Sequence, residues 1–224
     1  FRPLNEAIAS GRIRGVAADV GCNNPGMTQD KVHMEVITEL LKNDVLVVAT
    51  GCGAIAAGKY GYLLGEAGLD KVGPGLREIC ETIGIPPVLH LGSCVDNSRI
   101  LLAAGEVVRA GGLGQDISDL PAAGSAPEWM SEKAISIGHY FVASGVYTVF
   151  GVTLPVSGAP VFQKYLFEEF EKLYGGMWDL EVDPVLHARK MIAHIDKKRK
   201  ALGIDRARAR VMMDMASRRA LESA

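Results

Sequence analysis

The sequence predicts a three-layer α/β fold in which helices cover both faces of a mostly parallel sheet. Short apolar runs alternate with longer amphipathic segments, a rhythm typical of parallel strands joined by crossover helices. The short runs are almost continuously apolar, as expected for strands that are buried on both faces. Hydrophobic residues make up 48% of the 224 residues, which is ample for a sizeable core.

The apolar runs place the strands. The first three are predicted over residues 13–20, 45–49 and 88–91, which are rich in Val, Ala, Leu or Ile. A fourth is predicted over residues 146–150, and a short edge strand near 178–182. Because helical segments separate the strands, their carboxyl ends are expected to share one edge of the sheet.

Helices are predicted where apolar residues recur with a period of 3.6. Thr28 is a suitable N-cap for the second helix, and residues 111–127, with their Gly, Ser, Ala and Pro, are expected to form a loop. The predicted helices span residues 4–10, 28–42, 54–64, 75–83, 98–110, 128–143, 162–173 and 184–202.

Together these elements predict a single Rossmann-like domain over residues 1–224, with a helical extension from about 184 to 224. Basic residues outnumber acidic residues in this extension. Met191 and Ile195 nevertheless keep helical spacing within it, which favours a solvated helix face over a basic surface that binds a partner.

Composition argues against several functions. The net charge of −2 disfavours a general nucleic-acid binder, and no apolar run approaches the roughly 20 residues of a membrane span. The sequence begins at Phe1 and shows no secretory signal, so we expect a fragment or a processed product. Its four cysteines are expected to stay unpaired in a reducing cytoplasm.

Three of the cysteines share one sequence context. Cys22, Cys52 and Cys94 each follow a predicted strand and a Gly or Ser, and each precedes a predicted helix. They are therefore expected to converge at one sheet edge, where thiolates would form a soft site suited to iron–sulfur or nickel chemistry. Cys80 differs, because it lies within an amphipathic helix and is expected to be a core residue.

Simpler interpretations of these residues remain open at this point. The cysteine spacing matches no zinc motif, so position alone allows either a metal site or core packing. Lys133, within the helix predicted over residues 128–143, suits a proton donor beside a metal or a surface lysine paired with Glu132. The five histidines lack a partner at ligand spacing and are expected to be structural.

Four motifs carry a more specific signal. They are G-V-A-A-D-V-G-C-N-N-P at 15–25, V-V-A-T-G-C-G-A at 47–54, L-H-L-G-S-C-V-D-N-S-R at 89–99 and W-M-S-E-K-A-I-S-I-G at 129–138. In this order they closely resemble the C-terminal domain of the anaerobic nickel-dependent carbon monoxide dehydrogenases. The likeness is strong from residue 1 to about residue 158 and weaker beyond it.

The resemblance implies an active-site cluster of the Ni-4Fe-4S type. Such enzymes oxidise CO reversibly with water to CO₂, two protons and two electrons. By motif matching, Cys22 and Cys52 would bind irons and Cys94 would bind nickel. Lys133 would hydrogen-bond CO₂ or take part in proton movement, and Ile137 would form an apolar wall of the gas pocket.

The resemblance also implies partners and further domains. A ferredoxin-type electron carrier and a homodimer are expected for the complete enzyme. Family members carry an N-terminal helical domain with further 4Fe-4S clusters, and a middle domain that supplies a His and more Cys ligands. Neither domain is recognisable in these residues, so the sequence is expected to be the C-terminal third of a larger enzyme.

Two alternatives belong to other functional classes. The hybrid-cluster proteins, which reduce hydroxylamine, share this architecture and have related cysteine motifs. The second alternative is a cluster-free α/β module that serves in dimerisation or docking. The motifs at 89–99 and 129–138 fit the dehydrogenases better than the hybrid-cluster proteins.

Overall fold

A sheet of parallel strands forms the centre of the molecule. The computed structural model describes residues 1–65, 68–153 and 156–205. The strand order is β3-β2-β1-β4-β5-β6, and every neighbouring pair is parallel, which confirms the predicted fold class. The strands are β1 (Gly15–Asp19), β2 (Val45–Ala49), β3 (Val88–His90), β4 (Ala122–Ala126), β5 (Thr148–Phe150) and β6 (Trp178–Leu180).

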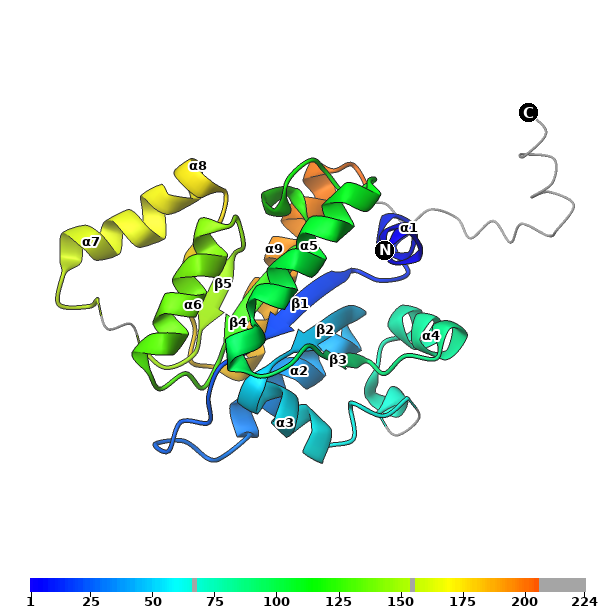
Figure 1. Ribbon diagram of the computed structural model, residues 1–224, viewed down its shortest axis with the longest axis horizontal. Helices are drawn as coiled ribbons and strands as arrows, with labels where there is room; N and C mark the ends of the chain where they lie inside the picture. The colour runs from blue at the N-terminus through cyan, green and yellow to red at the C-terminus, as the bar shows by residue number, and fades with distance from the viewer. Residues whose placement is uncertain (66–67, 154–155, 206–224) are drawn as a thin grey trace, which may run out of the picture.

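Helices cover both faces of this sheet. In Figure 1, α5 (Ser98–Ala110) crosses in front of β1 and β4, whereas α2 (Lys31–Lys42) and α9 (Pro184–Ala201) lie behind. The other α-helices are α1 (Arg2–Ala9), α3 (Gly51–Lys59), α4 (Pro74–Ile83), α6 (Glu132–Ala143), α7 (Pro160–Lys164) and α8 (Phe170–Tyr174). Shorter turns are η1 (Leu69–Lys71), η2 (Cys94–Asp96), η3 (Ile117–Asp119) and the π-helical η4 (Tyr165–Glu169), which joins α7 to α8.

One strand was missed by the sequence prediction. Residues 111–127 were expected to be a loop, yet β4 lies within them and pairs with both β1 and β5. Its sequence, A-A-G-S-A, has none of the β-branched or aromatic residues that mark a strand. Small residues suit this position because β4 lies in the crowded centre of the sheet. A Cβ added at Gly124, for example, would lie only 3.0 Å from the Oγ1 of Thr148.

Three helix starts differ from the predictions by three or more residues. Helix α2 begins at Lys31 and its N-cap is Asp30, in the left-handed region at φ 63°, so the prediction of Thr28 as N-cap was wrong. Helix α6 begins at Glu132, four residues later than predicted, because the preceding segment carries the buried Glu128. Helix α3 starts earlier than predicted, so that Cys52 lies in its first turn.

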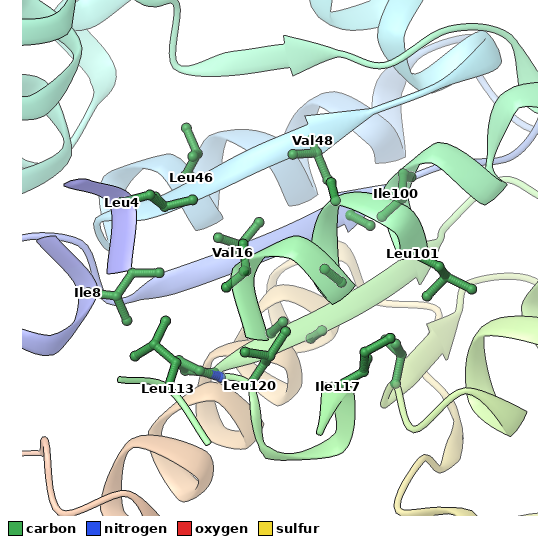
Figure 2. A pocket seen from close by; sticks show the side chains of 18 of the residues that line it. Leu4, Ile8, Val16, Leu46, Val48, Ile100, Leu101, Leu113, Ile117 and Leu120 are labelled. Carbon is green, nitrogen blue, oxygen red and sulfur yellow. The ribbon is translucent and has the colours of Figure 1, made fainter. Parts of the chain in front are cut away.

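An apolar cavity of about 110 Å³ lies between α1, α5 and the sheet. Figure 2 shows Leu4 and Ile8 of α1, Val16 of β1 and Leu101 of α5 around it. A smaller cavity at the carboxyl edge of the sheet shares Ala18 and Phe141 with the larger one. The apolar core therefore extends up to the edge that carries the cysteines.

The basic segment in α9 is not uniformly solvated. Arg199 is buried and donates to the backbone carbonyl oxygens of Ile8, Arg14 and Ile204, so it ties α9 to the first helix and strand. Lys197, in contrast, is exposed and pairs with Glu171. The predicted extension beyond residue 205 lies outside the described residues. In the described part of the chain, no helix combines the length and apolarity needed to cross a membrane.

Candidate metal centre

The three cysteines of interest follow neighbouring strands of the sheet. Cys22 comes shortly after β1, Cys52 lies in the first turn of α3 after β2, and Cys94 begins η2 after β3. Because β3, β2 and β1 are adjacent and parallel, all three residues lie at one edge. Each of these thiols is free and partly exposed, whereas Cys80 is buried within α4, as predicted for a core residue.

Backbone contacts hold the three cysteine segments together. The amide of Cys52 donates to the carbonyl oxygen of Gly21 (3.3 Å), and the amide of Gly51 donates to that of Gly92 (3.1 Å). Gly51 has a φ of +56°, and a Cβ there would lie 3.3 Å from the Cβ of Cys94. Glycine therefore allows both the turn and the close approach of the second and third segments.

Buried polar side chains fix the segment of Cys94. The hydroxyl of Thr50 donates to Oδ1 of Asn97, and Nδ2 of Asn97 donates to the carbonyl oxygen of Cys94 (3.0 Å). The amide and hydroxyl of Ser93 donate to Asp96, and these bonds hold the pKa of Asp96 below its ordinary value. The backbone around Cys94 is thus anchored on both sides.

Lys133 points its ammonium at these thiols. Its Nζ donates to the Sγ of Cys94 at 3.2 Å, which differs from the alternative of a pair with Glu132. The hydrogen bond to Cys94, and then the charges of Cys94, Cys22 and Cys52, raise the pKa of Lys133 above its ordinary value. One cation therefore faces all three sulfurs.

The position of Lys133 on its helix also differs from the prediction. It was expected in the middle of a helix but lies in the first turn of α6. Ile137 lies one turn further along and lines, with Lys133, Cys22 and Cys94, a cavity of about 20 Å³. This cavity adjoins the ends of β1 and β4, where the strand order reverses and α/β sheets bind their ligands.

The donor set fits a soft metal cluster. Among the described residues, no three His, Cys, Asp or Glu side chains are grouped around a position for a single ion. A multinuclear cluster makes a different demand, since each thiolate binds one metal atom and inorganic sulfide bridges the atoms. Three partly exposed thiols at one edge, with an ammonium among them, meet that demand with ligands of the right softness.

Sequence reasoning missed a buried polar cluster behind Cys22. Nδ1 of His33 lies 2.7 Å from Asp19, and its Nε2 lies 2.8 Å from the carbonyl oxygen of Cys22. Glu128 accepts hydrogen bonds from the first turn of α2. The sequence did contain one signal of this cluster, the carboxylate of Asp19 within an apolar strand. A carboxylate is buried there only when other groups hydrogen-bond to it, so Asp19 indicates polar partners.

The fold and the site define a Rossmann-like domain that carries three free cysteines and a lysine at one edge of its sheet. The Prismane/CO dehydrogenase family model matches residues 3–185. The chain belongs to this family.

Curated relatives and solved structures agree with this assignment. The chain is 53% identical over 202 residues to carbon monoxide dehydrogenase 1 of Methanosarcina acetivorans, covering 90% of this chain and 32% of that protein. Carbon monoxide dehydrogenase 1 of Methanosarcina mazei is 51% identical over 203 residues, which cover 91% of this chain and 32% of that protein. The chain thus spans about a third of the length of these relatives.

The solved structures share the fold closely. The as-isolated, nickel-free carbon monoxide dehydrogenase of Thermococcus sp. AM4 superposes with a TM-score of 0.86 at 54% identity, covering 90% of this chain and 31% of that one. An acetyl-CoA synthase/carbon monoxide dehydrogenase with NiZn[Fe4S4] and NiNi[Fe4S4] clusters superposes with a TM-score of 0.86 at 40% identity. The match covers 91% of this chain and 31% of that one.

Proposed function

We propose that this chain is the C-terminal part of a nickel–iron–sulfur carbon monoxide dehydrogenase. The observation that carries the proposal is the ammonium of Lys133 facing the thiols of Cys22, Cys52 and Cys94 at one sheet edge. The complete enzyme would convert CO and water to CO₂, two protons and two electrons, and would run in either direction.

The three cysteines would hold the cluster. Cys22 and Cys52 would bind irons of its iron–sulfur part, and Cys94 would bind nickel, since thiolates suit both metals. When bound, the cluster supplies the redox chemistry at carbon. The remaining ligands, a His and further Cys, would come from outside this sequence.

Lys133 and Ile137 would act on the substrate. The lysine ammonium would donate a hydrogen bond to a CO₂ oxygen and so stabilise the negative charge that develops there. The same group could hold or release a proton at Nζ as water is consumed. Ile137, on the same side of α6 and in the same cavity, would keep that space apolar.

The proposed enzyme also needs partners. A ferredoxin-type carrier would take the electrons, further 4Fe-4S clusters in an N-terminal domain would relay them, and the complete enzyme would be a cytoplasmic homodimer. The hybrid-cluster alternative is not favoured, because the similar curated relatives are named carbon monoxide dehydrogenases. A cluster-free docking module would leave the Lys133–Cys94 contact without a role.

Metal analysis tests the proposal directly. The complete protein, prepared anaerobically, is expected to contain nickel together with iron and sulfide. Iron without nickel in the active preparation would favour the hybrid-cluster alternative. Absence of both metals after anaerobic reconstitution would favour the docking module and would overturn the proposed function.

A further inference from the structure

Behind the cysteine edge lies a buried polar cluster that the proposed roles do not use. It consists of Asp19 at the end of β1, His33 on α2 and Glu128 after β4, and each of these residues has 0% exposure. Burying such groups costs free energy unless they are hydrogen-bonded. Their partners therefore indicate what the cluster holds in place.

The imidazole of His33 bridges Asp19 and the Cys22 backbone. Its Nδ1 lies 2.7 Å from Oδ2 of Asp19, and its Nε2 lies 2.8 Å from the carbonyl oxygen of Cys22. A carbonyl oxygen only accepts, so Nε2 carries a hydrogen and donates it to Cys22. The contact with Asp19 fixes the plane of the ring and thereby aims this donor.

The charge state of the ring agrees with this geometry. Burial disfavours the charged imidazole, but the charge of Asp19 and the hydrogen bonds to Asp19 and Cys22 outweigh that effect and raise the pKa of His33 to about 9. Hydrogens on both ring nitrogens match an acceptor on each side.

Glu128 fixes the helix that carries this histidine. Its Oε1 accepts from the amides of Val32 and His33 (2.9 and 3.3 Å), and its Oε2 accepts from Nδ2 of Asn23 (3.2 Å), the neighbour of Cys22. The loop of Cys22 is therefore tied to α2 and to the segment after β4 at once.

The cluster lies behind the second cysteine as well. A Cβ at Gly53, next to Cys52, would collide with the carboxylate of Asp19. In the part of the chain that the structure describes, however, Cys52 receives no side-chain hydrogen bond from this cluster. An effect of His33 should therefore be selective for Cys22.

We infer that His33 is a positioning residue for Cys22: it holds the backbone of this cysteine so that the thiol keeps its place at the sheet edge. That this position of the thiol serves to bind a metal atom rests on the proposed function. The contact itself is a property of the chain and is testable without metal.

Two variants at one position separate positioning from general stability. In His33→Asn the amide nitrogen lies near the place of Nδ1 and keeps the bond to Asp19. In His33→Gln it lies near the place of Nε2 and keeps the bond to Cys22. Both variants lose the ring and its charge, so both lower the stability of the protein to a similar extent.

The measurement is the alkylation rate of each cysteine in the complete protein, prepared anaerobically without metal. Iodoacetamide labelling followed by peptide mass spectrometry gives a rate for each thiol. His33→Asn is expected to raise the rate of Cys22 about ten-fold relative to Cys52 and Cys94, as loss of one buried hydrogen bond shifts a local opening equilibrium. In His33→Gln the rate of Cys22 should stay within about two-fold of wild type.

Cys80 and His194 supply the controls. Cys80 is buried in α4 and reports unfolding, and His194→Asn removes a buried histidine far from the cysteines, stacked on Tyr147. Equal acceleration of Cys22 in both His33 variants, or acceleration of all four cysteines together, would overturn the inference. So would an unchanged Cys22 rate in His33→Asn. These outcomes are independent of the metal analysis, which tests the proposed function alone.

Discussion

Lys133 carries a positive charge in the first turn of a helix, where the helix dipole disfavours it. Its side chain is exposed, so burial does not hold it there. The compensating interaction is with sulfur, since Nζ contacts the Sγ of Cys94, and Cys22 and Cys52 also act on it electrostatically. At the scale of single residues, the site is therefore a lysine cation kept close to cysteine sulfur.

Replacing this lysine tests its catalytic role. Lys133→Ala in the complete enzyme should lower CO-dependent viologen reduction on the order of 10²–10³-fold, as expected when one preorganised donor is lost. Nickel and iron contents should stay near wild type, because Lys133 is not a proposed ligand. Lys172→Ala, at an exposed lysine paired with Glu169 on the surface, is the matched control and should be active. Full activity of Lys133→Ala would reject the role, and loss of metal would make the lysine structural.

Replacing Cys94 tests the assignment of the nickel ligand. Cys94→Ala is expected to abolish CO oxidation and to lower nickel content while much of the iron stays, since a methyl group cannot replace a thiolate. Cys80→Ala should keep both metals, because Cys80 is buried in the core away from the edge. Metal analysis of both variants decides the matter: normal nickel occupancy in Cys94→Ala would show that another group binds nickel.

At the scale of elements, the sequence predicted those helices and strands that a regular pattern of hydrophobic residues marks. Strand β2 and helix α5 were predicted with the boundaries that the structure has. Strand β4 was missed because its residues are small and have low β-propensity. They suit the strand because neighbouring strands crowd it, and this crowding is visible only in the folded structure. The start of α6 was misplaced because Glu128 resembles a first-turn acid, while its partners, the amides of Val32 and His33, are distant in sequence.

The same limits apply to the site. Cysteines after strands could be predicted to share an edge, because parallel strands end on one side. The contact of Lys133 with Cys94 depends on how α6 packs, and the His33 cluster joins three segments far apart in sequence. Periodicity and spacing carry no information on such contacts, which explains why the histidine was expected to be merely structural.

Helix α5 offers a paired test of core packing. Leu101 is 7% exposed and lines the large apolar cavity, whereas its neighbour Leu102 is 69% exposed. Leu101→Ala should lower the free energy of unfolding by about 2–4 kcal/mol, because it enlarges an existing cavity. Leu102→Ala should change it by less than about 0.5 kcal/mol. Urea unfolding of both variants provides the comparison, and equal losses would mean that α5 does not pack as described.

At the scale of the whole molecule, the thiols of the cysteine edge and the buried histidines respond to different conditions. The cysteine edge depends on redox state and metal. His187 contacts Ser125, which lines the small cavity at that edge, and the carbonyl oxygen of Glu181, whereas His194 stacks on Tyr147. Burial is the main cause that lowers the pKa of each of these two histidines to about 4. They therefore remain neutral in the folded protein under mildly acidic conditions.

This difference predicts how stability changes with pH. Between pH 6.5 and about 4, the unfolded chain binds a proton at each of these histidines while the folded protein does not, so the free energy of unfolding falls as the pH falls. Each histidine should contribute about 2–3 kcal/mol over that window. On the alkaline side the sign reverses, because His33 stays protonated in the folded protein up to about pH 9, and its contribution is lost as the pH rises through that value.

The optimum of stability should accordingly lie near pH 6.5, between the two effects. Urea unfolding of the metal-free protein at a series of pH values gives the profile, and His194→Gln provides the check on its acid side. This variant should be less stable at pH 7, where the stacking on Tyr147 is lost, yet its stability should fall less steeply toward pH 4.5, because one group that takes up a proton on unfolding is gone. An acid slope as steep as that of wild type would mean that His194 does not stay neutral in the folded protein, and the acid sensitivity would then have to come from carboxylates.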